Sequence, residues 1–289
     1  MILTQLTPLQ QRLIVSTVGT LIVWVSIYFA LTPAFKPIFT LAIIAMIMTA
    51  MNELYRIAEV KGSQPARTLG FVITIVYTTA VAISTQFPIA STLPEITLLG
   101  SFLACFLYFF IRTTPPFINL SVTIFSIIYL IIPLSCMIRI VYFFSENGLQ
   151  DGRWWLLYLI SIAKMTDMGG FFIGKKFGKQ KLAPYISPKK TWEGALGGFC
   201  FAIITSLLMT LLARVLDVSF LLTLWESIWL GACIGVVAQF GDLAESLLKR
   251  DGGIKDSSHL PGLGGMLDIV DSLIFAAPLV YVFLKTWYT

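Results

Sequence analysis

The sequence predicts an all-α, polytopic integral membrane protein with about nine transmembrane helices, and two observations carry this prediction. Hydrophobic residues make up 57% of the 289 residues and charged residues only 12%, whereas soluble domains carry roughly 25% charged residues. The apolar residues also gather in long runs, and a helix needs about 20 of them to cross a bilayer. Such runs are too long for the strands of a barrel, so we expect one helical membrane domain over residues 1–289.

The predicted spans follow one another with short connections. Their ranges are 13–32, 38–54, 68–88, 96–111, 118–143, 154–175, 195–216, 225–248 and 267–286. The first run is too long for the apolar region of a typical signal peptide, and no clear small-residue cleavage site follows it, so we expect a retained helix. The second run is short, and the sixth, eighth and ninth carry charges. The fifth is compatible with one tilted span or with a span plus an interfacial segment.

The positive charges are distributed unevenly between the two sides of the predicted bundle. With nine spans, alternate loops face alternate sides, and the side that holds the N-terminus carries fourteen of the twenty Lys and Arg residues. Because cytoplasmic loops are enriched in Lys and Arg, we expect the N-terminus in the cytoplasm and the C-terminus outside. The polar loops near 176–194 and 249–266 then face the compartment that holds nucleotides.

The two halves of the chain differ in polarity. Residues 1–145 carry few charges and are expected to act mainly as scaffold, whereas the apolar segments of residues 160–289 carry or adjoin polar residues. An ionisable residue at the centre of a spanning helix costs about 2.5–3.5 kcal/mol on insertion scales, so it usually faces a cavity or a partner. Lys164 and Asp167, three residues apart, could neutralise one another in this way. We therefore expect the catalytic half of the domain at 160–289.

Four acids lie at the ends of the last two predicted helices. Asp242 and Glu245 are three residues apart and share a helix face, and Asp268 and Asp271 repeat this spacing. Carboxylate oxygens suit Mg²⁺, so these acids are candidate metal ligands. Two ordinary alternatives stay open. Glu245 has Lys249 four residues later as an ion-pair partner, and Asp268 and Asp271 suit the dipole at a helix N-terminus.

A lysine-rich segment, residues 174–194, lies on the same predicted side as these acids. It reads GKKFGKQKLAPYISPKKTWEG and contains six lysines. Lysine is a flexible point charge that suits phosphate groups, and Ser187, Lys189 and Lys190 stand out because they come just before the next helix. The alternative is topological: these lysines would hold the loop in the cytoplasm and contact anionic lipid.

The polar residues of the second half follow the signature of a known family. The chain matches it at Ser246, Lys249, Arg250, Lys255, Asp256, Pro261, Gly262, Gly264, Gly265, Asp268 and Asp271. With Asp167 and the run SPKKTWEG, these residues resemble the phosphatidate cytidylyltransferase family, also called CDP-diacylglycerol synthases. The chain departs from the family at three points. Leu263 stands where His is usual, Ile269 stands where Arg is usual, and the stretch from Asp256 to Pro261 is one residue shorter.

The resemblance implies transfer of CMP from CTP to phosphatidic acid, which yields CDP-diacylglycerol and pyrophosphate in phospholipid biosynthesis. It implies Asp242, Asp268 and Asp271 as catalytic residues that hold Mg²⁺, with room for a second cation such as K⁺. The substrate contacts that it implies are Asp167, Ser187, Lys189, Lys190, Lys249, Arg250, Lys255 and Asp256.

We therefore expect CTP, phosphatidic acid and the lipid bilayer as partners, and no nucleic acid. The active site should lie at the cytoplasmic face of the cell inner membrane, and a homodimer stays open. Two other functions remain alternatives. A transporter would use Lys164, Asp167 and Asp242 as a charged path, although the sequence gathers its charges at one face. A catalytically weakened relative that binds lipid would fit the replacements at Leu263 and Ile269.

Overall fold

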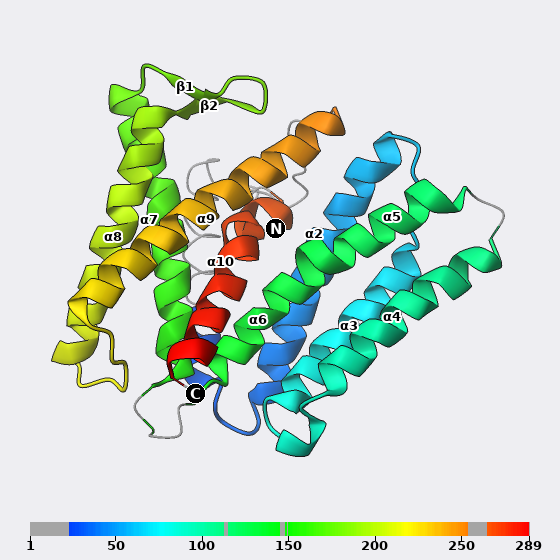
Figure 1. Ribbon diagram of the computed structural model, residues 1–289, viewed down its shortest axis with the longest axis horizontal. Helices are drawn as coiled ribbons and strands as arrows, with labels where there is room; N and C mark the ends of the chain where they lie inside the picture. Colours follow the sequence, from blue (N-terminus) through cyan, green and yellow to red (C-terminus); the bar gives the residue numbers. More distant parts are fainter. Residues whose placement is uncertain (1–22, 113–114, 145–147, 149, 254–264, 289) are drawn as a thin grey trace, which may run out of the picture. The chain divides into compact units, whose positions relative to one another are not determined.

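The computed structural model describes residues 23–112, 115–144, 148, 150–253 and 265–288 (Figure 1). Eight helices in this part of the chain are long and apolar enough to cross a membrane. They coincide with eight of the predicted spans, and the first half of the ninth, 13–32, lies outside the described residues. The prediction of an all-α, multi-pass membrane protein is confirmed.

The first four described spans come from the apolar N-terminal half. They are α2 (Lys36–Val60), α3 (Arg67–Ser84), α4 (Leu93–Phe110) with a 3-10 turn before it (Pro88–Ala90), and a composite span. The composite span consists of α5 (Pro116–Ser126), a π-helical stretch (Ile127–Ile131) and α6 (Ile132–Val141). Proline in the first turn of α2, α4 and α5 suits a helix start, where the missing N–H has no helical partner. The alternatives left open for 118–143 are thereby resolved in favour of one span, Pro116–Val141.

The second half contributes the other four spans and a small sheet. The spans are α7 (Gly152–Phe177), α8 (Trp192–Val215), α9 (Leu224–Asp251) and α10 (Met266–Trp287). Between α7 and α8, strands β1 (Lys181–Ala183) and β2 (Ser187–Thr191) pair antiparallel, with Lys181 opposite Thr191 and Ala183 opposite Ser187. The lysine-rich segment expected as a loop is therefore a β-hairpin. This matters because a strand fixes the direction of each lysine side chain.

Residue contacts divide the chain into two compact units. The first comprises Met1–Ile132 and Asp251–Val270, and the second comprises Pro133–Arg250 and Asp271–Thr289. The expected division into a scaffold half and a catalytic half stays a prediction.

Buried polar side chains join the helices of the first unit. The Tyr55 hydroxyl on α2 lies 2.8 Å from the Ser126 hydroxyl on α5. The carbonyl oxygen of the Asn119 side chain accepts a hydrogen bond from the Gln64 amide at 2.6 Å, and the Thr123 hydroxyl accepts one from the Ala66 amide at 3.0 Å. Such bonds help to hold helices together in a bilayer. There the hydrophobic effect contributes little, because lipid tails are as apolar as the side chains that would be buried.

Small residues and hydroxyl groups pack the second unit. At Gly194 of α8, a Cβ atom would lie 2.8 Å from the Gly170 carbonyl oxygen of α7, so this contact requires glycine. Deeper in the unit, the Ser206 hydroxyl lies 2.6 Å from the Tyr158 hydroxyl and 2.9 Å from the Ser227 hydroxyl, which joins α7, α8 and α9. These contacts fix the three helices that carry most of the candidate site.

Candidate active site

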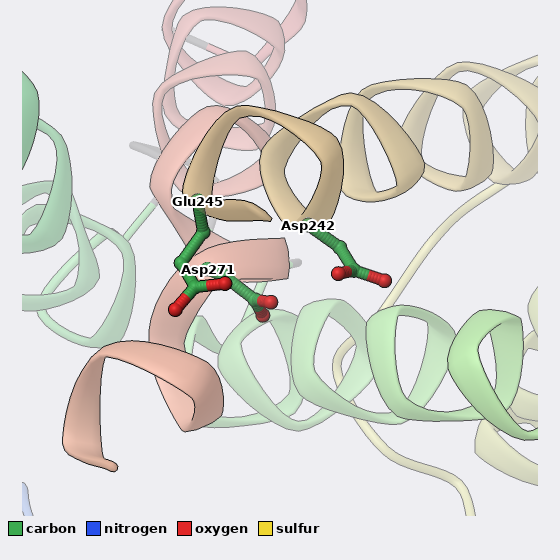
Figure 2. A group of neighbouring side chains, drawn as sticks. All are labelled: Asp242, Glu245 and Asp271. Carbon is green, nitrogen blue, oxygen red and sulfur yellow. The ribbon is translucent and has the colours of Figure 1, made fainter. Parts of the chain in front are cut away.

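Three carboxylates meet where α9 and α10 approach each other. Asp242 and Glu245 come from α9 and Asp271 from α10, and one oxygen of each lies within 4.8 Å of the others (Figure 2). The helices can come close because residue 241 is glycine. A Cβ atom at Gly241 would overlap the Asp271 carbonyl oxygen. Glu245 and Asp271 are buried, whereas Asp242 is partly exposed. We call these three residues the acidic group.

Two lysines neutralise part of the acidic group. Lys190 Nζ on β2 lies 2.6 Å from Asp242 Oδ2, and Lys249 Nζ lies 2.5 Å from Glu245 Oε1. The ion pair between Glu245 and Lys249 was one sequence alternative and is confirmed, but Glu245 also belongs to the acidic group. The Asp271 carboxylate accepts a hydrogen bond from the Ser272 amide. Buried carboxylates need such partners, because an unpaired charge loses its hydration.

The donor set fits a hard divalent cation. Mg²⁺ binds carboxylate oxygens and is usually held by one or two carboxylates together with water and substrate phosphates. Asp242, Glu245 and Asp271 offer three such groups within reach of a single ion. The residue types and their proximity therefore support a candidate metal centre at this point of α9 and α10.

A cavity of about 450 Å³ lies beside Asp242 in the second unit. Five residues predicted from the sequence line it: Asp167, Ser187, Lys189, Lys190 and Asp242. Lys175 adds a third lysine, Gln239 adds an amide, and Phe171 and Leu182 add apolar surface. The cavity therefore offers cationic groups for an anion and apolar wall for hydrocarbon, next to the candidate metal centre.

Local hydrogen bonds hold the β-hairpin that carries these lysines. Thr191 caps α8, its hydroxyl accepting a hydrogen bond from the Gly194 amide at 3.1 Å. The Glu193 carboxylate accepts bonds from the Lys179 and Gln180 amides at 3.0 and 3.2 Å. Arg250 at the end of α9 donates from Nε to the Ile186 carbonyl oxygen at 3.0 Å, which ties the hairpin turn to α9.

The remaining predicted residues lie in different places. Asp268 is in the first turn of α10, three residues before Asp271, and its carboxylate accepts a bond from the Gly265 amide at 3.0 Å. Within the part of the chain that the structure describes, it is not one of the three residues of the acidic group. Asp167 pairs with Lys164 at 3.5 Å, as the spacing predicted. Lys255, Asp256 and Leu263 lie outside the described residues.

Sequence reasoning missed two residues, one lining the cavity and one contacting the start of α10. Gln239 lines the cavity, and its amide nitrogen donates to the Ala195 carbonyl oxygen at 3.2 Å. Glu53 is a buried acid of α2 whose carboxylate accepts from the Met266 and Leu267 amides at the start of α10. An acid at the end of the predicted span 38–54 was the available signal for Glu53, because ionisable residues in spans are uncommon and usually functional.

The fold and the site define a polytopic membrane protein with an acidic group beside a lysine-lined cavity. The sequence model of the cytidylyltransferase family matches residues 10–287, and the chain belongs to that family. The resemblance inferred from the signature residues is thereby confirmed.

Among curated proteins, the chain is similar to several phosphatidate cytidylyltransferases. It is 39% identical to that of Chlamydia trachomatis over 170 residues, which cover 58% of this chain and 56% of the relative. It is 39% identical to that of Staphylococcus aureus over 157 residues, covering 52% and 58%. For Staphylococcus haemolyticus the identity is 38% over 148 residues, covering 51% and 54%. The chain thus spans about half the length of the curated relatives it matches.

Proposed function

We propose that this protein is a phosphatidate cytidylyltransferase, which transfers CMP from CTP to phosphatidic acid and releases pyrophosphate. One observation carries the proposal: the acidic group lies directly beside a lysine-lined cavity in a membrane protein of the cytidylyltransferase family. The reaction joins two anions, so positive charge is needed to offset their repulsion. The names of the curated relatives support the same activity.

The proposed reaction is a single displacement at phosphorus. A phosphate oxygen of phosphatidic acid forms a bond to the α-phosphorus of CTP. The bond from that phosphorus to the oxygen that bridges to the β-phosphate breaks, and pyrophosphate leaves with the electron pair. Because the nucleophile is already an oxyanion, the protein needs no activated serine or cysteine. Its work is positioning and charge stabilisation, as in other phosphoryl transfers.

Each part of the site has a role in this proposal. Asp242, Asp268 and Asp271 would hold Mg²⁺, with Glu245 as a further ligand from the acidic group, and the bound ion would supply charge neutralisation at the phosphates. A second cation such as K⁺ stays part of the proposal.

The phosphates would be contacted by residues of β2 and by the further residues that the family signature implies. Lys189 and Lys190 present ammonium groups from β2, and Ser187 presents a hydroxyl from the same strand. Lys249, Arg250, Lys255, Asp256 and Asp167 complete the proposed substrate contacts. The apolar wall at Phe171 and Leu182 suits the first carbons of a lipid chain.

The charge distribution supports a particular membrane arrangement. The excess of Lys and Arg on the side of the N-terminus supports a cytoplasmic N-terminus and an active site at the cytoplasmic face of the inner membrane. There CTP would arrive from the cytoplasm and phosphatidic acid from the bilayer. A homodimer is compatible with this arrangement.

A pyrophosphate-release assay tests the proposal. Purified protein with phosphatidic acid, CTP and Mg²⁺ should release pyrophosphate, and omission of any one of the three should stop release. Asp271→Asn should abolish release while the protein still inserts into the membrane. The matched control is Asp217→Asn, because Asp217 follows α8, away from the acidic group and the cavity lining. No release by the wild-type protein would count against the proposal and leave the transporter and lipid-binding alternatives, which an ion-flux assay would separate.

A further inference from the structure

Glu53 of α2 makes an unusual contact with the helix that carries Asp268 and Asp271. It is only 4% exposed, and it lies inside the apolar span Lys36–Val60. Its Oε1 accepts a hydrogen bond from the Met266 amide at 2.8 Å, and its Oε2 accepts one from the Leu267 amide at 2.9 Å. Both partners belong to the first compact unit, so the contact lies wholly within that unit.

The carboxylate of Glu53 provides acceptors for backbone amides at the start of α10. The first four amides of a helix have no acceptor within the helix. A side-chain oxygen of the preceding residue usually accepts from one of them, but here that residue is Gly265, which has no side chain. Glu53 therefore supplies from another helix the acceptor that the local sequence lacks. Its negative charge also suits the positive end of the α10 dipole.

Asp268 and Glu53 divide the amides at the start of α10 between them. The Asp268 carboxylate accepts from the Gly265 amide at 3.0 Å, whereas Glu53 accepts from the next two amides. The bond from the Gly265 amide to Asp268 is one of the two bonds of a capping box. In that motif the side chain of the third helical residue accepts a hydrogen bond from the backbone amide of the residue that precedes the helix. Without Glu53, the buried Leu267 amide and the partly buried Met266 amide would compete for the carboxylate of Asp268 or stay unsatisfied. Buried N–H groups without an acceptor are rare in folded proteins.

We propose that Glu53 is a positioning residue of the active site. By fixing the first turn of α10, it holds Asp268 and, one turn further along the same helix, Asp271 in the orientation that binds a cation. The proposal rests on the proposed function, because it assigns the α10 acids to a metal centre. It also gives the N-terminal half, which the sequence marked mainly as scaffold, a direct part in the site.

The test compares Glu53→Gln with Glu59→Gln. Glutamine nearly keeps the volume of Glu53 but replaces one acceptor oxygen by an NH₂ group that faces a backbone donor. Glu59 lies on the same helix, is exposed, and pairs with Arg67 at 2.8 Å, so it is a matched control for loss of one acid from α2. Mn²⁺ serves as the probe, and its binding to purified protein without nucleotide or lipid is followed by electron paramagnetic resonance. Amide exchange at the start of α10 is measured by mass spectrometry.

Glu53→Gln should weaken Mn²⁺ binding by up to about 30-fold, the range that loss of a helix cap carries. It should also speed amide exchange in the first turn of α10, whereas Glu59→Gln should change neither quantity. If Glu53→Gln fails to accumulate, Glu53→Asp takes its place, because it keeps the charge but shortens the reach, and the shift should be smaller in the same direction.

The outcomes separate this proposal from the proposed function. If the wild-type protein releases pyrophosphate and binds Mn²⁺, but the Glu53 variant binds Mn²⁺ equally well, the positioning role is overturned and the enzyme stands. A lower melting temperature with unchanged Mn²⁺ affinity also overturns it, since the role of Glu53 would then be purely structural. If the wild-type protein binds no Mn²⁺ and releases no pyrophosphate, both proposals fail together.

Discussion

Replacing Lys190 by Met should affect metal and nucleotide in opposite directions. Lys190 Nζ lies 2.6 Å from Asp242 Oδ2, and Asp242 belongs to the acidic group that we assign to Mg²⁺. In the proposed site, lysine and metal would therefore compete for the same carboxylate. A cation held by Asp242 would free Lys190 to face the cavity that it already lines, where a phosphate would take the place of the carboxylate. Lys190→Met removes the competitor for the metal and also a contact for the phosphate.

The exposure of the ion pair sets the magnitude of the first effect. The side chains of Lys190 and Asp242 are 24% and 35% exposed, so water screens their attraction. Partly exposed pairs contribute about 0.2–1 kcal/mol, so Mn²⁺ affinity in the absence of nucleotide should rise by up to about fivefold. A hydrogen bond to a charged group contributes about 1.5–3 kcal/mol, so kcat/KM for CTP should fall by about 10- to 100-fold.

The assay pairs Mn²⁺ titration of the purified protein with steady-state pyrophosphate release. Lys189→Met is the matched control, because Lys189 is the neighbouring residue on β2 and also lines the cavity, but the ion pair with Asp242 belongs to Lys190. The control should lower kcat/KM for CTP without raising Mn²⁺ affinity. Equal Mn²⁺ affinity in both variants and the wild type would refute the competition, and weaker Mn²⁺ binding in Lys190→Met would reverse its sign.

Three further predictions concern the packing and charge of the site. Glu245→Gln breaks the buried ion pair with Lys249, so it should destabilise the fold by about 3–5 kcal/mol. An unchanged melting temperature in detergent would contradict the buried pair. Gly194→Val should also lower the melting temperature, because its Cβ would lie 2.8 Å from the Gly170 carbonyl oxygen; wild-type stability would argue against this helix contact. Chelation of divalent cations by EDTA should stop pyrophosphate release and added Mg²⁺ should restore it, so release that persists in EDTA would exclude a required divalent ion.

The spans were predictable because the bilayer imposes a simple rule of length and apolarity on each helix. Hydropathy is less informative about their ends. The eighth run was placed at 225–248, yet α9 continues to Asp251, because Lys249 and Arg250 lower hydropathy without ending a helix. The π-helical stretch Ile127–Ile131 and the short strands of the hairpin leave no periodic signal of sufficient length.

The candidate site was predictable only as far as local spacing reaches. The pair of Glu245 with Lys249 follows from an i+4 relation and was open to prediction. That Glu245 also faces Asp271 depends on the close approach of α9 and α10 at Gly241, which no spacing within one helix encodes. The contact of Glu53 with Met266 joins residues 213 positions apart, so only the folded chain reveals it.

The central claim is that this membrane protein transfers a cytidylyl group at the acidic group. The most direct test supplies radiolabelled CTP and phosphatidic acid to the purified protein and measures label in the lipid extract. We predict that CDP-diacylglycerol forms with Mg²⁺ in the wild-type protein and is absent with Asp271→Asn. Label that never enters the lipid would contradict the claim, and so would an Asp271→Asn variant that labels lipid as fast as the wild type.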